Sequence, residues 1–445
     1  MSKNSVKIIV FFILIAMFIN AFSESYVSHS LTNLAYVLAL GIDVGEKAKL
    51  KITAQFSKAT AFDSGGGSSD SSSQIVMVSG EADSIFSGIN LLNSYIGKEL
   101  NLAHCNVVVF SEELAKNGIG TQIYSLINNE EIRPSTNILV SKCSAYDYLN
   151  NVRPNIEKLT IQYFDTFSIT SRLTGYISNL TIGEFYNNLS SEIKAGTAIL
   201  GGLNATARTE SSERTSESSS NENSSSQSSS SESSNQNSQS GGSSSELSDV
   251  ITNPEDLTAG SSSVEGERGT ENIGLAVFNG DKLCGELTAI EAISHLLIKN
   301  KVDSCIVSIN NPYNNSSKVE LQLYPTKKSK ISVDINDDVP HISIELKIDA
   351  DILTLDENID YGQENVLETF SNATTEYLEK EICDYLNKVS KEYSTDIDNF
   401  GNKALAYFAT SSEWKDFDWS EKFKNAEFDV NVDVTVISSL LITKT

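Results

Sequence analysis

The chain is poor in the residues that build most metal sites and disulfide frameworks. Of its 445 residues, five are cysteine and four are histidine. The cysteines are odd in number and far apart, so neither a disulfide framework nor a CxxC metal motif can be recognised. No two histidines have the spacing of a metal-binding pair such as HExxH. We therefore predict no metal site and no cofactor.

Basic residues are also scarce relative to acidic ones. The sequence has 33 lysines and arginines against 59 aspartates and glutamates, which gives a formal net charge of -26. Nucleic-acid binding depends on cationic side chains that displace counterions from phosphates. The composition argues against a nucleic-acid partner, and it makes an anionic membrane surface a poor partner for the folded body.

Common catalytic motifs are missing as well. The sequence contains no GxSxG element, no Walker loop and no GxGxxG fingerprint. His104 precedes an expected strand, where a structural role is favoured over a catalytic one. We predict that the protein is not an enzyme. An exported hydrolase built from distant residues is the weakest alternative.

The N-terminus has the layout of a secretory signal. Lys3 and Lys7 precede an apolar run at residues 8–19, and the triplet Ala21, Phe22 and Ser23 follows, with small residues at 21 and 23. The run is shorter than the ~20 residues that span a bilayer comfortably. Residues 1–23 are therefore predicted to be a signal peptide or a short N-terminal membrane anchor, and the rest of the chain is expected to work outside the cytoplasm.

Composition and periodicity divide the remainder into three parts. Residues 26–200 alternate between strand and helix patterns and predict an α/β region, with a possible helical subdomain at 151–200. Residues 208–270 are rich in serine and poor in apolar side chains, which predicts a disordered linker. Residues 272–445 show a hairpin at an Asn-Gly-Asp turn, alternating strands and a long amphipathic helix. The expected fold class is α+β, with an N-terminal α/β half and a C-terminal half whose antiparallel sheet is packed by that helix.

One acidic segment matches a calcium loop at positions 1, 3, 5 and 12, which are Asp334, Asn336, Asp338 and Glu345. The sixth position of such a loop needs glycine for its sharp turn, but Val339 stands there. The alternating residues that follow favour a β-hairpin instead.

Two tryptophans near the C-terminus form the most conspicuous aromatic cluster. Trp414 and Trp419 are separated by four residues that include Phe417. Such a cluster can stack on a ligand, but in this position it more often belongs to a core or to a partner interface. We treat Trp414 and Trp419 as a possible interaction surface.

Several sequence blocks, taken in order, carry a family resemblance. The first half supplies residues 34–43 (LAYVLALGID), a serine and glycine loop at Gly65, Gly80 with its following helix, and residues 102–119 (LAHCNVVVFSEELAKNGI). The second half supplies residues 274–285 (GLAVFNGDKLCG), 396–405 (DIDNFGNKAL) and 414–423 (WKDFDWSEKF). In order and spacing these blocks resemble the Ger(x)C family of bacterial spore germination proteins, the C subunits of germinant receptors.

The resemblance implies a multi-subdomain protein on the outer face of the membrane, which in the spore is the inner membrane. It would act with membrane-embedded A-type and B-type subunits in a receptor for small nutrients, without enzymatic activity and with no assigned ligand pocket. One departure stands out: Ser25 takes the place of the family's lipobox cysteine. A serine hydroxyl is not the thiolate that accepts the lipid, so ordinary lipoprotein anchoring is not expected.

A second class of function stays open at this point. The chain could be an extracytoplasmic solute-binding or sensor protein that captures a small nutrient on its own. Calorimetry of the isolated protein with amino acids and sugars would separate the two hypotheses, because tight binding would favour the second.

Overall fold

The computed structural model describes most of the chain outside three long segments. The described residues are Ile15, 34–57, 75–152, 160–204 apart from 192 and 194, and 256–437 apart from 263, 265, 267, 355–358, 360 and 362. The predicted signal or anchor at 1–23 lies outside this set except for Ile15, Ser25 lies outside it, and so does most of the predicted linker at 208–270.

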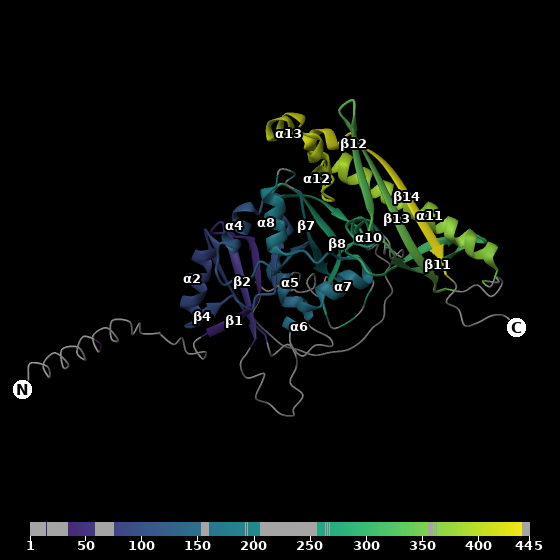
Figure 1. The fold of residues 1–445 in the computed structure, drawn as a ribbon. Helices are drawn as coiled ribbons and strands as arrows, with labels where there is room; N and C mark the ends of the chain where they lie inside the picture. The colour runs from purple at the N-terminus through teal and green to yellow at the C-terminus, as the bar shows by residue number, and fades with distance from the viewer. Residues whose placement is uncertain are drawn as a thin grey trace, which may run out of the picture.

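The larger of two sheets has its parallel strands in the middle and antiparallel strands at both sides (Figure 1). Its order is β3-β2-β1-β5-β6-β7-β8-β9, and β4 pairs with the start of β1. The central pairs β1–β5, β5–β6 and β6–β7 are parallel. The strands are β1 (Leu34–Val44), β2 (Leu50–Ser57), β3 (Ile75–Ala82), β4 (Glu99–Asn101), β5 (Val107–Ser111), β6 (Asn137–Ser141), β7 (Ala195–Leu203), β8 (Thr270–Asn279) and β9 (Lys282–Leu287).

Helices cover both faces of this sheet, which explains why its central strands are mostly apolar. All five residues of β5 are buried, as expected for a parallel strand with helices on either side. One face packs against α2 (Ile85–Ile96), α3 (Glu112–Asn117), α4 (Gly120–Ile127) and α8 (Ile182–Ser190). The other packs against α5 (Ala145–Asn151), α6 (Thr160–Asp165) and α7 (Phe167–Thr174).

The second sheet is mainly antiparallel and has the order β10-β11-β13-β12, with β14 paired in parallel to β13. Its long helix α11 (Glu364–Asn387) lies against β14 and ends in a π-helical turn at Lys388–Glu392. The strands are β10 (Cys305–Asn311), β11 (Asn314–Pro325), β12 (Lys330–Asn336), β13 (Val339–Ile352) and β14 (Glu427–Val436).

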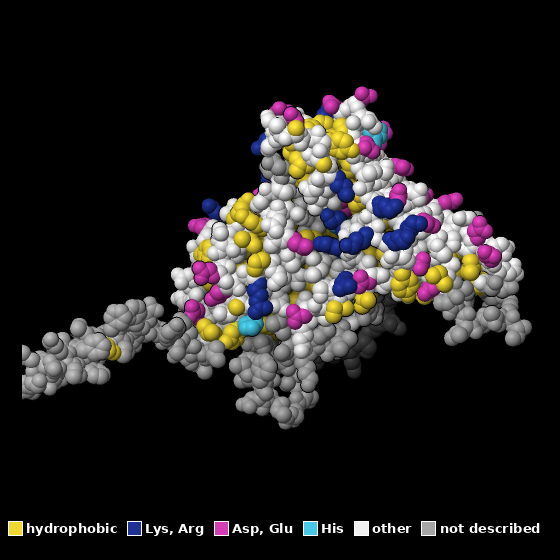
Figure 2. All heavy atoms as spheres, in the orientation of Figure 1, with side chains coloured by type: hydrophobic (Ala, Val, Ile, Leu, Met, Phe, Trp, Pro, Cys, Tyr) yellow, Lys and Arg dark blue, Asp and Glu magenta, His cyan; other side chains and the backbone are white. Residues whose placement is uncertain are grey.

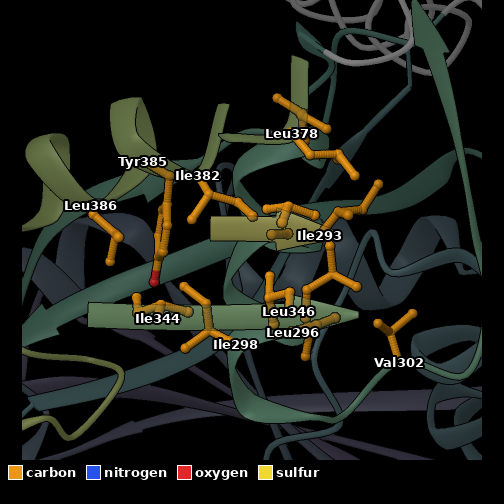
Figure 3. Packing of buried hydrophobic residues seen from close by; sticks show 14 of the residues in the cluster. Ile293, Leu296, Ile298, Val302, Ile344, Leu346, Leu378, Ile382, Tyr385 and Leu386 are labelled. Atoms are coloured by element: carbon orange, nitrogen blue, oxygen red, sulfur yellow. The ribbon is translucent and has the colours of Figure 1, made fainter. Parts of the chain in front are cut away.

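Helix α10 (Ala289–Lys299) joins the two sheets into one core. Nine of its eleven residues are buried, which is typical of a helix that contacts protein on all sides. Figure 3 shows its residues Ile293, Leu296 and Ile298 in one cluster with residues of α11 and β13. The helix also contacts β8 and β9 of the large sheet.

Short helices form a cap at one end of the molecule, beside the β12–β13 turn (Figure 1). They are α12 (Gly401–Ala404), a 3-10 turn at Leu405–Tyr407, α13 (Ser411–Phe417) and α14 (Trp419–Phe423). The start of β1 lies at the opposite end (Figure 1).

The α+β fold class is confirmed. The boundary between the two sheets, however, does not fall where the composition of the chain predicted a boundary between its halves. The predicted Asn-Gly-Asp hairpin is present as β8–β9, with φ of 63° at Gly280. This hairpin belongs to the large sheet, because β8 pairs antiparallel with β7. The two halves of the chain therefore share one sheet, because β7 and β8 pair although the low-complexity segment separates them in sequence. Composition does not reveal this pairing.

Two further boundaries differ from the sequence-based expectation. Residues 151–200 do not form a helical unit of their own, because α8 and α7 cover opposite faces of the large sheet and β7 is one of its strands. The last part of the predicted linker is packed: Ala259 is buried and its N–H donates to the Ile273 carbonyl at 2.9 Å. The Glu271 carboxylate accepts the N–H groups of Gly260 and Ser262, and hydrogen bonds of this kind order a segment that has few apolar side chains.

Candidate functional site

The two tryptophans singled out in the sequence lie in the core of the helical cap. Trp414 is 5% exposed and Trp419 is 4% exposed. Their rings stack with centroids 5.8 Å apart and planes 24° apart. The indoles therefore stabilise the cap itself, and in this structure they do not present a surface to a partner.

A buried carboxylate ties the cap to the main body. Asp396 accepts the N–H groups of Phe400 at 3.0 Å and Gly401 at 2.7 Å, and the indole N–H of Trp419 at 3.0 Å. Burial raises the pKa of Asp396 to about 6, although these three hydrogen bonds favour its charged form. The DIDNFG segment and the WKDFDWSEKF segment, which resemble family blocks, thus meet at one carboxylate.

A second buried polar cluster joins α10, α11 and the same segment. Tyr385 donates its phenol proton to Asp398 Oδ2 at 2.7 Å. Because the Tyr385 hydroxyl already donates its proton to Asp398, Tyr385 Oη must accept in its hydrogen bond of 3.0 Å with His295 Nδ1. Nδ1 is therefore the donor and carries a proton. His295 Nδ1 also lies 2.9 Å from Asp398 Oδ1 without being aligned for a hydrogen bond with it.

This cluster has residue types found in catalytic sites, but its position favours a structural role. His295, Tyr385 and Asp398 are all buried, whereas a catalytic group must reach its substrate. Burial raises the pKa of Tyr385 well above its ordinary value, so the phenol keeps its proton. The sequence analysis missed these residues because they come from three separate segments; the DIDNFG block was the one available signal.

Other residues considered from the sequence do not converge on a site. His104 is exposed and packs edge-on against Tyr36, with centroids 5.2 Å apart. The calcium-like segment forms the expected hairpin, and its turn residues Asp337 and Asp338 have φ of 50° and 65°, as a two-residue hairpin turn requires. Within the described ranges, no three His, Cys, Asp or Glu side chains are grouped as metal ligands.

The outer side of the cap carries exposed apolar residues, which we call the apolar tip: Leu405, Tyr407, Phe408 and Phe417. Leu405 is 45% exposed and Tyr407 is 58% exposed, while the two phenylalanines are half-buried. Figure 2 shows hydrophobic side chains gathered on the cap. Exposed apolar patches of this kind mark interaction sites. The buried Trp414 packs against Phe408 and Phe417 and so supports the apolar tip from beneath.

A group of lysines, which we call the basic cluster, forms a contrasting surface. Its lysines lie at the end of α10 and in the β11–β12 loop. These two segments are held together by Asn300 and Ser329, which exchange hydrogen bonds of 2.8 and 2.6 Å. Lys330 forms an ion pair with Glu345, and Lys301 forms one with Glu184. No described residue forms an ion pair with Lys327 or Lys328. Dark blue side chains gather over this region in Figure 2. Its members are Lys299, Lys301, Lys327, Lys328 and Lys330.

Comparisons with known proteins identify both halves of the chain. A family model described as the spore germination protein N-terminal domain matches residues 28–204. A second, described as spore germination B3/GerAC like, C-terminal, matches residues 273–439. No curated protein sequence matches the chain.

A solved structure shares the overall fold. The crystal structure of the GerBC protein superimposes with a TM-score of 0.50 at 15% sequence identity, covering 89% of this chain and 96% of that chain. At this identity the similarity concerns the fold alone.

Proposed function

Because the chain belongs to the Ger(x)C family of spore germination proteins, we propose that it is the C subunit of a germinant receptor and acts with membrane-embedded A-type and B-type subunits. The observation that carries the proposal is the pair of family matches, which cover residues 28–204 and 273–439 and so include most of the described residues. The subunit is proposed to be non-enzymatic and to work through its surfaces.

Two surfaces are suited to protein partners. The apolar tip offers aromatic and aliphatic side chains of the kind that dominate binding energy at interfaces. The basic cluster provides positive charge on a chain whose net charge is -26, so it would select an acidic partner surface.

Membrane association is proposed to come from the N-terminal segment or from the partner subunits. None of the helices in the described ranges is at once long enough and apolar enough to cross a bilayer. Ser25 in place of the lipobox cysteine argues against lipid attachment. Membrane fractionation of the native protein, with an intact mass for its N-terminus, tests both points: a diacylglycerol adduct would contradict the absence of lipid attachment, and recovery in the cytosol with residues 1–23 intact would contradict the location.

Deletion of the gene tests the function. In a strain that lacks paralogous receptors, spores should form in normal numbers but fail to lose refractility when nutrients are added. Re-expression of the intact chain should restore the response. Normal nutrient-triggered germination of the deletion strain would reject the proposal.

A further inference from the structure

The basic cluster is the starting point for a further proposal, which rests on the proposed receptor function. Two short stretches supply its five lysines: residues 299–301 (KNK) at the end of α10, and residues 327–330 (KKSK) around the β11–β12 loop (Figure 2). Only Lys301 and Lys330 are paired with carboxylates, so the five lysines and these two partners leave a local charge of +3. This positive charge lies on a chain whose formal net charge is -26.

Hydrogen bonds hold the β11–β12 loop in place on both sides of its two adjacent lysines. On one side, Thr326 donates its N–H to the carbonyl of Lys347 on β13 at 2.9 Å. On the other side, Ser329 donates its hydroxyl to the Ile298 carbonyl of α10 at 2.7 Å. Residues 327 and 328 lie between these two anchors, so the fold fixes where their positive charge is presented.

This arrangement brings like charges together, and the resulting repulsion disfavours the fold. Lys299 has a structural reason for its position, because a cation at the C-terminal end of a helix complements the helix dipole. Its ammonium also donates to the Asp398 carbonyl at 3.1 Å. Lys327 and Lys328 have no such reason: both are exposed, and no described residue forms an ion pair with either of them. Residues that break a local rule without a structural gain are expected at functional sites.

We propose that the basic cluster binds an acidic polypeptide segment of another receptor subunit, whose carboxylates match the local charge of +3. Lys327 and Lys328 make the first contact, since they have no carboxylate to give up. Lys301 and Lys330 join them at little cost, because exposed ion pairs contribute little free energy and exchange partners readily. Complementary charge of this kind speeds association and rejects the wrong partners.

The surroundings of the cluster favour a narrow segment over an anionic membrane surface. Glu184 and Glu345 lie against its lysines, and Asp433 lies 2.6 Å from the ammonium of the neighbouring Lys347. A flat anionic surface would cover these carboxylates together with the lysines, and the net charge of the chain would repel it. A single extended segment can follow the lysines and leave the carboxylates in water.

Binding of a glutamate-rich peptide of about ten residues to the full chain tests the proposal. The fluorescence anisotropy of the labelled peptide should give a dissociation constant of about 10–100 µM in about 0.05 M salt. The affinity should fall at least about fivefold in about 0.3 M salt, because salt screens the attraction between exposed charges. The double variant Lys327→Glu/Lys328→Glu should raise the dissociation constant at least about tenfold. A peptide with glutamine in place of each glutamate should not bind.

The matched control is Lys49→Glu/Lys98→Glu, which reverses two exposed lysines beside strands of the large sheet and changes the net charge by the same amount. It should leave the dissociation constant within about twofold of the wild-type value. Equal weakening by the two variants would overturn the proposal, because the peptide would then respond to net charge alone. Binding of phosphatidylglycerol vesicles without binding of the peptide would also overturn it, since the ligand would then be a lipid headgroup.

Lysine labelling followed by mass spectrometry identifies what covers the cluster. In the isolated full chain, Lys327 and Lys328 should react with an amine-specific reagent as quickly as the exposed Lys49. In the complex with the membrane-embedded subunits, both should be protected while Lys49 stays reactive. Slow labelling of Lys327 and Lys328 in the isolated chain would overturn the proposal, since another segment of the same chain would then occupy the cluster.

Spores separate a failure of this proposal from a failure of the receptor function. Spores that carry Lys327→Glu/Lys328→Glu should contain the protein but lose its co-isolation with the membrane-embedded subunits and respond weakly to nutrients. Normal co-isolation and germination of these spores, in a strain in which the gene deletion abolishes germination, would reject the basic cluster and leave the receptor function in place. Normal germination of the deletion strain itself would reject the receptor function and this proposal with it.

Discussion

Asp396 shows how much local structure can depend on one carboxylate. Its oxygens accept three buried donors, two from the backbone of the following turn and one from the Trp419 indole. The cap has no sheet of its own, so these bonds and the stacked indoles fix its orientation. The sequence indicated that the aromatic residues matter, but it did not show which carboxylate holds them.

Replacing this carboxylate should destabilise the cap strongly. Asp396→Ala leaves three buried N–H groups without an acceptor, and each costs about 1–3 kcal/mol, so we expect a loss of at least about 3 kcal/mol. Asp396→Asn keeps an acceptor oxygen and should cost clearly less. Urea unfolding followed by tryptophan fluorescence measures this directly, because the chain has only two tryptophans. Equal stability of the two variants would contradict the assignment.

The raised pKa of Asp396 also predicts a pH dependence. The pKa of Asp396 is about 6 in the folded protein against 3.8 for an unperturbed aspartate, so between these values the native state binds more protons than the unfolded state. The ionised Asp396 side chain therefore lowers the free energy of unfolding, and this contribution reaches its full size above about pH 6. The contribution disappears as the pH falls toward 3.8. A difference of about two pKa units corresponds to about 3 kcal/mol.

The comparison with Asp396→Asn isolates that effect. The free energy of unfolding of the wild type, measured relative to Asp396→Asn, should be larger at pH 4.5 than at pH 7.5. A relative stability that increases with pH would show that the carboxylate is stabilised in the folded state, opposite to the prediction.

At the scale of secondary-structure elements, β8 decides how the two halves of the chain come to share one sheet. Gly274 has φ of 87°, and a Cβ there would lie 2.1 Å from the Leu287 carbonyl oxygen. Only glycine fits both the left-handed backbone and the close approach of β9. The hairpin itself was predictable from its Asn-Gly-Asp turn, whereas its pairing with β7 was not, because strand pairing across a long insertion leaves no local periodicity.

A pair of glycine variants separates the two constraints at Gly274. Gly274→Ala should destabilise the protein by at least about 3 kcal/mol, since the added methyl meets backbone. Gly97 has a similar φ of 67° but nothing within 4 Å of an added Cβ, so Gly97→Ala should cost only about 1 kcal/mol. Urea midpoints of both variants check this, and equal losses would show that backbone strain alone accounts for the effect.

At the scale of the whole molecule, the apolar tip and the start of β1 lie at opposite ends (Figure 1). A chain tethered near its N-terminus would therefore hold the tip far from the tether. The position of the tip follows from α10, which packs against both sheets and fixes the cap relative to the large sheet.

Leu405→Glu tests the tip as a partner surface. Leu405 is 45% exposed, so the charge should leave the urea midpoint unchanged while reducing co-isolation with the membrane-embedded subunits at least about tenfold, as loss of a central apolar contact does. Ile306→Glu is the control, because Ile306 is 46% exposed on β10. Normal co-isolation and germination with Leu405→Glu would remove the tip from the interface.

From the sequence alone, many of the local elements and the family could be predicted, whereas β7 and the short cap helices α12 to α14 were not. Periodicity fixed the long helix, the alternating strand at the C-terminus and the two hairpins, because these patterns depend on near neighbours in the chain. The order and spacing of several sequence blocks pointed to the family that both matches then identified. Tertiary structure alone decided that β7 and β8 share a sheet, that the tryptophans are buried, and that His295, Tyr385 and Asp398 meet. These contacts join residues of different elements, from 13 positions apart for Tyr385 and Asp398 to 90 for His295 and Tyr385, and they follow from packing the whole core rather than from any local pattern.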